Sequence, residues 1–344
     1  MSKMKSGAVV KTRKLRTLRR RDGLIAHARD VTSQNGEDGI IARLFELLPD
    51  PQHGPRWLVD VGAWDGKHLS NTHSLLTNGH AGTSPHAWRG VLIEADPSRF
   101  AELVRLHGAP GTPPPQQRNI CVCRSVSCAA ESPDALPAIL ASAAPELPRD
   151  FDFLCVDVDG TDYWLVAALL RRDAAGEMHG TGSGTDSADA KAAGVGDVAA
   201  AVDGRTPAVY RPKVVCVEFN PTIPDDVIFV QARDDGVRHG SSLAALVELL
   251  HGAGYTLVET TVFNAFFVTN ELYSNYLHSH VPDTSIEALH ETSMGTRLYQ
   301  LYDGTLKLAG CRKLLWHRRP IHEEDIQALP AEQRHFPFAP PPPS

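Results

Sequence analysis

Residues 57–66 read WLVDVGAWDG, and this stretch decides the fold. Its first residues are apolar apart from Asp60, which is typical of a strand that is covered on both faces of a sheet. Gly62 and Gly66 follow, and glycine lets a backbone take positive φ and approach a ligand closely. A helical pattern then runs over 69–78. A strand, a glycine turn and a helix in this order predict a parallel α/β sheet, in which ligands bind at the carboxyl ends of the strands.

The rest of the chain repeats this alternation of strand and helix. The first strand (57–62) is followed by β-rich apolar runs at 90–96, 119–123, 151–160, 213–220, 255–261 and 264–269, and further helical patterns cover 97–107, 134–142, 162–172 and 242–252. This alternation predicts a doubly covered, mainly parallel sheet of seven strands. The last two runs are too close in sequence for a crossover helix, so we expect them to form an antiparallel hairpin at one end of the sheet.

The segments around these runs define three parts of the chain. We expect a basic leader over 1–22, an α/β domain over 23–275 and a less regular extension over 276–344, with a β-hairpin around Asp303-Gly304 and a proline-rich tail. Residues 79–88 lengthen one connection. Residues 173–208 contain seven glycines and no Leu, Ile or aromatic residue, so we interpret them as a disordered surface insertion.

Composition excludes several classes of protein. The 344 residues carry 34 Lys and Arg against 41 Asp and Glu, and nine of the basic residues lie before residue 22. The remainder is therefore strongly acidic, which argues against a nucleic-acid scaffold. No apolar run reaches the ~18 residues of a membrane span. The six cysteines lack zinc-site spacing and no secretory segment precedes them, so we expect a reducing compartment, the cytoplasm, unless the Arg-rich leader targets an organelle.

Two acidic strand ends indicate a nucleoside-containing cofactor. Glu94 ends the second strand, where a carboxylate can accept hydrogen bonds from ribose hydroxyls, and Asp96 is suited to cap the helix that begins at Pro97. A dinucleotide site requires G-x-G-x-x-G, but Trp64 occupies the position of the second glycine. S-adenosylmethionine has no pyrophosphate, and its positive sulfonium and amino groups favour a carboxylate such as Asp60.

Acids also follow the fourth and fifth strands. Asp157, Asp159 and Asp162 form a D-x-D-x-x-D array, in which a strand conformation would place Asp157 and Asp159 on one face. Neighbouring carboxylates repel unless a cation joins them or one holds a proton. With Glu218 and Asn220 after the next strand, Asp157 and Asp159 form a candidate site for Mg²⁺ or Mn²⁺; the alternative is that these groups cap loops and bind water.

These motifs together resemble the class I S-adenosylmethionine-dependent methyltransferases, and among them the FkbM-type group. The resemblance covers about residues 31–270 and rests on SQNGEDGI, VDVGAWDGKHLSNT, LIEADPSRF, FDFLCVDVDGTDYW, VVCVEFNPTIP and GYTLVETT with NAFFV. It implies a Rossmann-like sheet of seven strands in the order 3-2-1-4-5-7-6 with the last strand antiparallel. It also implies a cofactor site at the first two strand ends, which we take as Asp60, Gly62, Ala63, Gly66, Glu94 and Asp96.

Two further motifs have structural and functional interpretations. In SQNGED (33–38), Ser33 or Asn35 is a suitable helix N-cap, and the resemblance implies that this segment folds over the cofactor cleft. The hydroxyls of Ser241 and Ser242 are expected to cap the helix at 242–252. His239, just before them, is a candidate base.

We therefore expect a methyltransferase that acts on an oxygen nucleophile of a small-molecule, glycan or lipid acceptor. Asp157 or Asp159 would accept the proton of the acceptor hydroxyl, or a bound divalent ion would lower its pKa. One alternative is a catalytically inactive binding or scaffold protein. Another is an NAD(P)-dependent oxidoreductase, against which the missing glycine counts.

Overall fold

The structure is a computed structural model that describes residues 23–52, 54–78, 88–108, 119–170, 210–290 and 294–337. The leader, the insertion at 173–208, the proline-rich tail and all of 79–88 except Trp88 lie outside the described residues, so the expectations for them stay predictions. No helix in the described part of the chain has both the length and the apolar character that crossing a bilayer requires.

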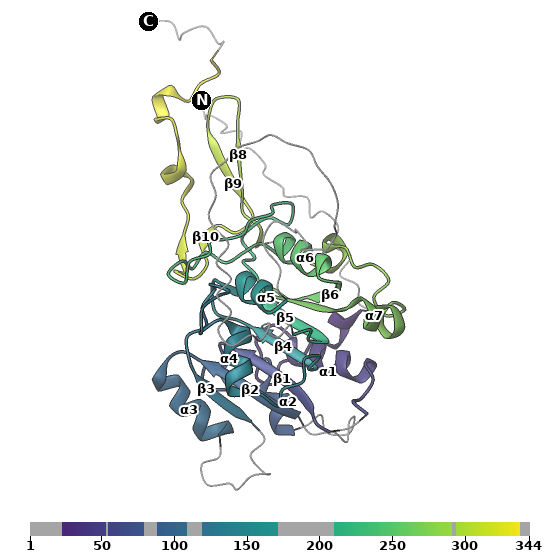
Figure 1. Ribbon diagram of the computed structural model, residues 1–344. Helices are drawn as coiled ribbons and strands as arrows, with labels where there is room; N and C mark the ends of the chain where they lie inside the picture. The colour runs from purple at the N-terminus through teal and green to yellow at the C-terminus, as the bar shows by residue number, and fades with distance from the viewer. Residues whose placement is uncertain are drawn as a thin grey trace, which may run out of the picture.

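A seven-stranded sheet forms the centre of the molecule (Figure 1). Its strand order is β3-β2-β1-β4-β5-β7-β6, and β7 is antiparallel to both of its neighbours, β5 and β6. The predicted fold class, strand order and terminal hairpin are thereby confirmed. The strands are β1 (Arg56–Val61), β2 (Trp88–Glu94), β3 (Ile120–Cys123), β4 (Phe153–Val156), β5 (Val214–Glu218), β6 (Tyr255–Thr260) and β7 (Asn264–Thr269).

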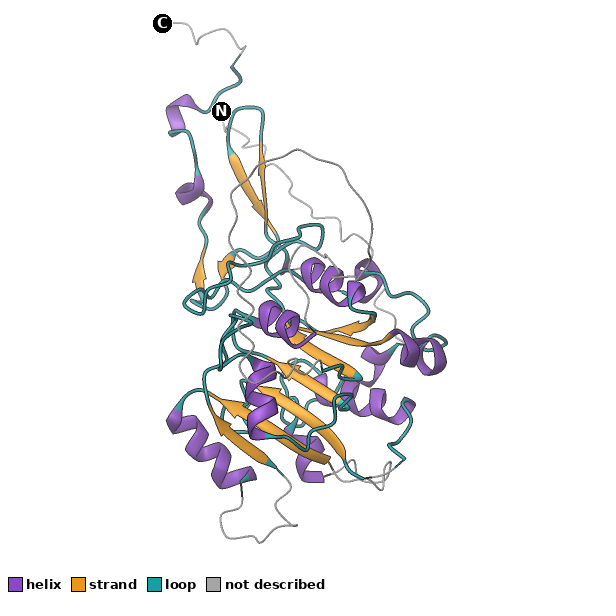
Figure 2. Ribbon diagram, in the orientation of Figure 1, coloured by secondary structure: helices purple, strands orange, loops and turns teal. Residues whose placement is uncertain are grey.

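Helices cover both faces of the sheet, as Figure 2 shows. They are α1 (Glu37–Leu47), α2 (His73–Asn78), α3 (Pro97–His107), α4 (Leu136–Ala143), α5 (Asp162–Leu170) and α6 (Leu243–Gly252), and a short 3₁₀ turn, η1 (Leu24–His27), precedes them. The predicted helices over 69–78, 97–107, 134–142, 162–172 and 242–252 all form, with shorter ends in most cases.

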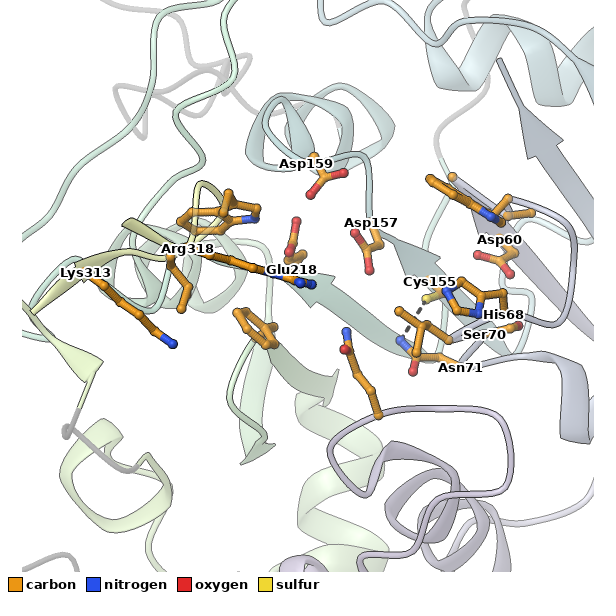
Figure 3. A pocket seen from close by; sticks show the side chains of 18 residues that line it. Asp60, His68, Ser70, Asn71, Cys155, Asp157, Asp159, Glu218, Lys313 and Arg318 are labelled. Carbon is orange, nitrogen blue, oxygen red and sulfur yellow. Dashed lines mark hydrogen bonds between the residues drawn. The ribbon is translucent and has the colours of Figure 1, made fainter. Parts of the chain in front are cut away.

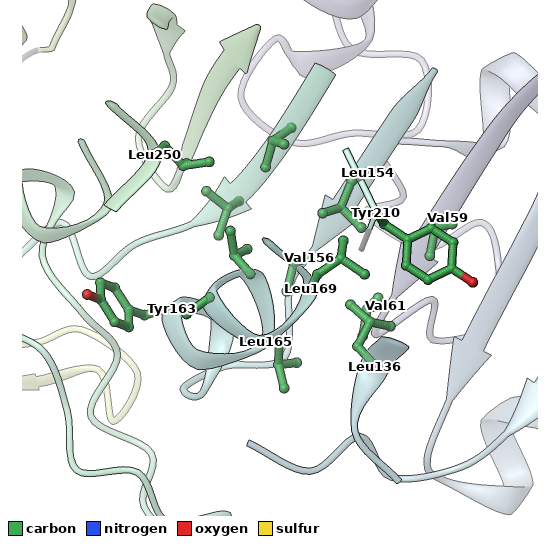
Figure 4. Packing of buried hydrophobic residues seen from close by; sticks show 14 of the residues in the cluster. Val59, Val61, Leu136, Leu154, Val156, Tyr163, Leu165, Leu169, Tyr210 and Leu250 are labelled. Atoms are coloured by element: carbon green, nitrogen blue, oxygen red, sulfur yellow. The ribbon is translucent and has the colours of Figure 1, made fainter. Parts of the chain in front are cut away.

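Alternation along the strands sorts the buried side chains into two cores. In β1, Val59 and Val61 belong to a cluster with α4, α5 and α6, part of which Figure 4 shows. Leu58 points to the opposite face of the sheet and belongs to the cluster of α1, α2 and α3. Because side chains alternate between the two faces of a sheet, Asp60 lies on the same face as Leu58, near the carboxyl end of β1.

The N-terminus of α1 differs from the prediction. Gly36, in the left-handed conformation, is the N-cap, and neither Ser33 nor Asn35 takes that place. The reason is Asp38, whose buried carboxylate accepts the backbone N–H groups of Val31, Thr32 and Ser33 and folds the preceding segment back over the helix end. The expected caps of two other helices are confirmed: Asp96 caps α3 and Ser242 caps α6.

The C-terminal extension carries two hairpins. β8 (Arg297–Gln300) and β9 (Leu306–Ala309) form the hairpin predicted around Asp303-Gly304, and it projects away from the sheet in Figure 1. β10 (Lys313–Leu314) pairs with β11 (Arg319–Pro320) in a second, unpredicted hairpin. The remaining elements are α7 (Asn270–Leu272), η2 (Tyr273–Leu277), α8 (Ile286–Leu289), η4 (Glu323–Ile326) and η5 (Ala331–Gln333). Leu277 is fully buried in the core beside α1, so packing continues past residue 275.

Candidate functional site

A cavity of about 600 Å³ lies at the carboxyl ends of β1, β4 and β5 (Figure 3). It brings together six of the predicted residues. They are Asp60 in β1, Gly62 and Ala63 just after β1, Asp157 and Asp159 after β4, and Glu218 at the end of β5. An adjoining cavity of about 280 Å³ contains Glu94 and Asp96 and shares Gly62, Trp64, Asp157 and Asp159 with the first. The predicted cofactor residues are therefore neighbours along one edge of the sheet, except that Gly66 lines neither cavity.

The two glycines of the turn are required by the fold itself. Gly62 has φ +89°, and a Cβ atom there would lie 1.8 Å from the carbonyl oxygen of Asp157. Gly66 has φ +78°, and a Cβ atom there would meet the side chains of Leu103 and His107 at 2.5–2.6 Å. These contacts explain both glycines without a ligand, because the turn packs directly on β4 and α3.

Glu94 fixes the conformation of the turn. Its side chain is only 8% exposed and accepts the N–H of Trp64 at 2.8 Å with one carboxylate oxygen and the N–H of Asp96 at 2.7 Å with the other. Trp64 has φ +50°, a left-handed conformation that is uncommon for a tryptophan and that this hydrogen bond supports. Each oxygen of the carboxylate has a second lone pair, so Glu94 retains acceptor capacity for a ligand.

Asp60 is a buried acid that faces a cavity. It is 5% exposed, and Thr72 Oγ1 donates to its carboxylate at 2.6 Å. Burial, and then the negative charge of Glu94, raise the pKa of Asp60 to about 6. Among the described residues no Lys, Arg or His forms an ion pair with it. A positively charged ligand in the cavity would stabilise the carboxylate form.

Three carboxylates converge in the middle of the cavity. Asp157, Asp159 and Glu218 each present an oxygen, and these oxygens lie within 4.8 Å of one another. Burial, followed by the charges of Asp162 and Asp159, raises the pKa of Asp157 to about 7. Burial and the charge of Asp157 raise the pKa of Glu218 well above its usual range. At neutral pH this group therefore retains a proton or attracts a cation.

The structure corrects two predictions for this group, on the strand placement of Asp157 and Asp159 and on Asn220, and it gives Asp162 a separate role. β4 ends at Val156, so a loop and not the alternation of a strand brings Asp157 and Asp159 together; Asp159 has φ +55°. Asp162 instead accepts the N–H groups of Val158 and Gly160, both at 2.9 Å, at the start of α5. Asn220 does not join the carboxylates, because its Oδ1 accepts the N–H and the hydroxyl of Thr222.

Asn220 and His239 line a third cavity, of about 280 Å³. The amide group of Asn220 donates to the carbonyl of His239 at 2.9 Å, and Asp159 and Glu218 form part of the same wall. The backbone N–H of His239 is held by the side chain of Gln231 at 2.9 Å. The histidine is therefore near the carboxylates, but no described contact joins its ring to them.

The SQNGED segment lies beside the cavity. Glu37 is fully buried, and Thr261 and Asn264 of the β6–β7 turn donate to its carboxylate at 2.7 and 3.3 Å. Asp38 also accepts the hydroxyl of Ser74 at 2.5 Å. These contacts hold the loop in place, and Gln34 reaches the cavity wall.

Several residues that line the cavity were not predicted from the sequence. Ser70 and Asn71 come from the loop before α2, whereas Lys313, Trp316 and Arg318 come from the β10–β11 hairpin. The basic and aromatic composition of residues 312–319 was the available signal, but it carries no information about which part of the fold the hairpin reaches.

No protein-family model and no curated protein matches the sequence. Among solved structures, the citrinin polyketide synthase CMeT domain is 12% identical with a TM-score of 0.36, covering 68% of this chain and 51% of that one. The [4+2]-cyclase SpnF is 13% identical with a TM-score of 0.32, covering 68% of this chain and 64% of that one.

A TehB-like SAM-dependent methyltransferase from Corynebacterium glutamicum is 11% identical with a TM-score of 0.31, covering 72% of this chain and 91% of that one. The chain spans about half the length of the CMeT domain structure and under two thirds of SpnF. All three similarities are distant, with TM-scores below 0.4 and identities of 11–13%.

Proposed function

We propose that this protein binds S-adenosylmethionine at the β1 and β2 ends and transfers its methyl group to an oxygen of an acceptor, as expected of an FkbM-type enzyme. The observation that carries the proposal is the pair of buried carboxylates, Asp60 and Glu94, on either side of one turn and each facing a cavity. The turn between them is held by the N–H groups of Gly62 and Ala63, which both donate to the carbonyl of Ile93 at 3.0 Å.

The residues present fit this cofactor chemically. Asp60 has no cationic partner among the described residues and is suited to the positive sulfonium or amino group. Glu94 keeps free lone pairs for ribose hydroxyls. The two adjoining cavities, about 600 and 280 Å³, are in the range of small-molecule sites and leave room for an acceptor.

S-adenosylmethionine, when bound, supplies an electrophilic methyl group. The chain must then align the acceptor oxygen and remove its proton. Asp157 is suited to that task, since its raised pKa of about 7 matches a group that accepts a proton near neutral pH. Asp159 is the more exposed acid of the group and is placed to contact an acceptor.

A divalent cation is the second candidate for this step. Asp157, Asp159 and Glu218 supply three oxygen ligands that suit Mg²⁺ or Mn²⁺. If turnover persists in excess chelator, a carboxylate removes the proton without a metal ion. If turnover is lost in chelator and restored by Mg²⁺ or Mn²⁺, a bound ion takes part in this step.

Calorimetry with S-adenosylhomocysteine tests the cofactor site. We expect the wild type to bind it and not NAD, and Asp60→Asn to weaken binding about tenfold or more because the buried negative charge is lost. Asp225→Asn is the matched control: burial raises the pKa of Asp225 to about 6 as well, but it lines none of the three cavities. Gly62→Val is unsuitable, since its side chain would strike the Asp157 carbonyl.

Three results would contradict the proposal. If the wild type does not bind S-adenosylhomocysteine, the proposed cofactor is wrong. If it binds NAD in preference, the result favours an oxidoreductase. Binding without any transfer of labelled methyl groups to a cell extract would instead favour the inactive binding protein.

A further inference from the structure

We propose that the β10–β11 hairpin forms the acceptor-binding wall of the cavity and selects a hydroxylated acceptor that carries an acidic group, such as a carboxylate, sulfate or phosphate. This inference rests on the proposed methyl transfer for the identity of the acceptor. The wall consists of Lys313, Trp316 and Arg318, which we call the hairpin wall.

The hairpin wall lies across the cavity from the proposed cofactor residues. Figure 3 shows Lys313 and Arg318 on one side, Asp60 and Cys155 on the other, and the carboxylates of Glu218, Asp157 and Asp159 between them. A cofactor beside Asp60 would lie next to the carboxylates of Asp157, Asp159 and Glu218, which we call the middle carboxylates. The space that remains beyond these carboxylates, toward the hairpin, is where the rest of the acceptor would lie.

The cations of the hairpin wall are available to a ligand. Neither Lys313 nor Arg318 forms an ion pair with a described residue, and both side chains are exposed. Other cations of the same extension are paired: Lys307 and Arg312 with Glu323 at 2.8 and 2.6 Å, and Arg297 with Asp226 at 2.6 Å. Two unpaired cations that line one cavity are therefore suited to an anionic group.

Trp316, which lies between Lys313 and Arg318 in the sequence, adds a flat apolar surface to the hairpin wall. It lies in the four-residue turn of the hairpin, is 52% exposed and lines both the main cavity and the cavity of His239. An exposed tryptophan in a cavity wall is suited to stacking on a ring of the ligand, aromatic or saccharide.

Charge determines how such an acceptor would be oriented. The middle carboxylates repel an anion, whereas a neutral hydroxyl can donate a hydrogen bond to them. The hairpin wall attracts the anion. An acceptor with one hydroxyl end and one acidic end would therefore place the hydroxyl at Asp157 and Asp159 and the acidic group at Lys313 and Arg318.

Matched pairs of acidic and neutral hydroxyl compounds test the inference. The pairs are 3,4-dihydroxybenzoate with 3,4-dihydroxybenzyl alcohol, and glucose 6-phosphate with glucose, titrated into the full chain by calorimetry. We expect the acid of at least one pair to bind about tenfold more tightly than its neutral partner. The double variant Lys313→Gln/Arg318→Gln should lose this preference, and Lys313→Arg should retain it.

Arg319→Gln is the matched control, because Arg319 is an exposed neighbour on the same hairpin that lines none of the three cavities. The inference is overturned if neither acid binds better than its neutral partner, or if the preference survives in the double variant. Binding of S-adenosylhomocysteine, measured separately, should be unchanged in the double variant. Loss of that binding would assign the hairpin cations to the cofactor and overturn the inference, whereas absence of it in the wild type would count against the proposed function alone.

Discussion

Single residues in this protein have roles that their type alone does not reveal. Asp157, Asp159 and Asp162 lie within six positions of one another, yet two of them line the cavity and the third accepts the N–H groups of Val158 and Gly160. Gly62 resembles a cofactor-binding glycine, and the contact that requires it is the Asp157 carbonyl. A residue's function here depends on which polar groups are already occupied by the fold.

The availability of Asp159 leads to a test of catalysis. Asp159 is the exposed member of the three carboxylates and has φ +55°, a left-handed conformation that asparagine also tolerates, so Asp159→Asn should fold normally. We expect it to lower turnover at least about a hundredfold, because a group that accepts or orients the proton is lost, while affinity for S-adenosylhomocysteine stays within about twofold. Methylation at the wild-type rate, measured with labelled cofactor, would show that Asp159 has no chemical role.

At the scale of elements, buried hydrogen bonds attach the loop before α1 to two helices, α1 and α2. The loop before α1 is held through Asp38, which accepts three backbone N–H groups and the Ser74 hydroxyl. The β10–β11 hairpin, in contrast, follows Arg312, whose side chain donates to Glu323 at 2.6 Å, and neither of these two residues lines the cavity. The first arrangement shapes the cavity, and the second leaves one of its walls free for a ligand.

Removal of the Asp38 carboxylate should destabilise the protein. Burial is the largest single influence on the pKa of Asp38 and raises it. The hydrogen bonds from Ser33, Ser74, Thr32 and Val31 together have a greater effect in the opposite direction, so the pKa of Asp38 is lowered. Asp38→Ala leaves these donors without a partner, so we expect a loss of roughly 3 kcal/mol or more in the free energy of unfolding. Urea denaturation measures it, with exposed Glu46→Ala as the control. A loss below roughly 1 kcal/mol would show that water replaces the carboxylate.

At the scale of the whole molecule, acids with raised pKa gather where the strands end. Burial is the first cause in each case, and it raises the pKa of Asp60 and Asp162 to about 6 and of Asp157 to about 7. These acids bind protons more strongly in the folded than in the unfolded chain. Their protonation contributes to the free energy of unfolding, and this contribution is fully present below about pH 4. It is lost as the pH rises through the folded-state pKa values of about 6 and 7.

Asp157→Asn isolates this effect. The variant removes a charge that the folded protein disfavours, so its unfolding temperature should exceed that of the wild type at pH 8 and approach it at pH 5, with chelator present and no cofactor. The comparison between variant and wild type cancels the opposing contribution of His73 and His107, whose pKa values burial lowers. An equal difference in unfolding temperature at both pH values would contradict the raised pKa of Asp157.

The sequence by itself determined the succession of strands and helices along the chain, the terminal hairpin and the caps Asp96 and Ser242, because periodicity, strand spacing and capping are local properties of the chain. It also placed Asp60, Glu94 and Asp157 at one edge of the sheet, since parallel strands end together. Only the tertiary structure decided that Asn220 bonds to Thr222, that the Asp157 carbonyl requires Gly62 and that Lys313, Trp316 and Arg318 line the cavity. Those facts depend on the packing of distant segments, which no local pattern encodes.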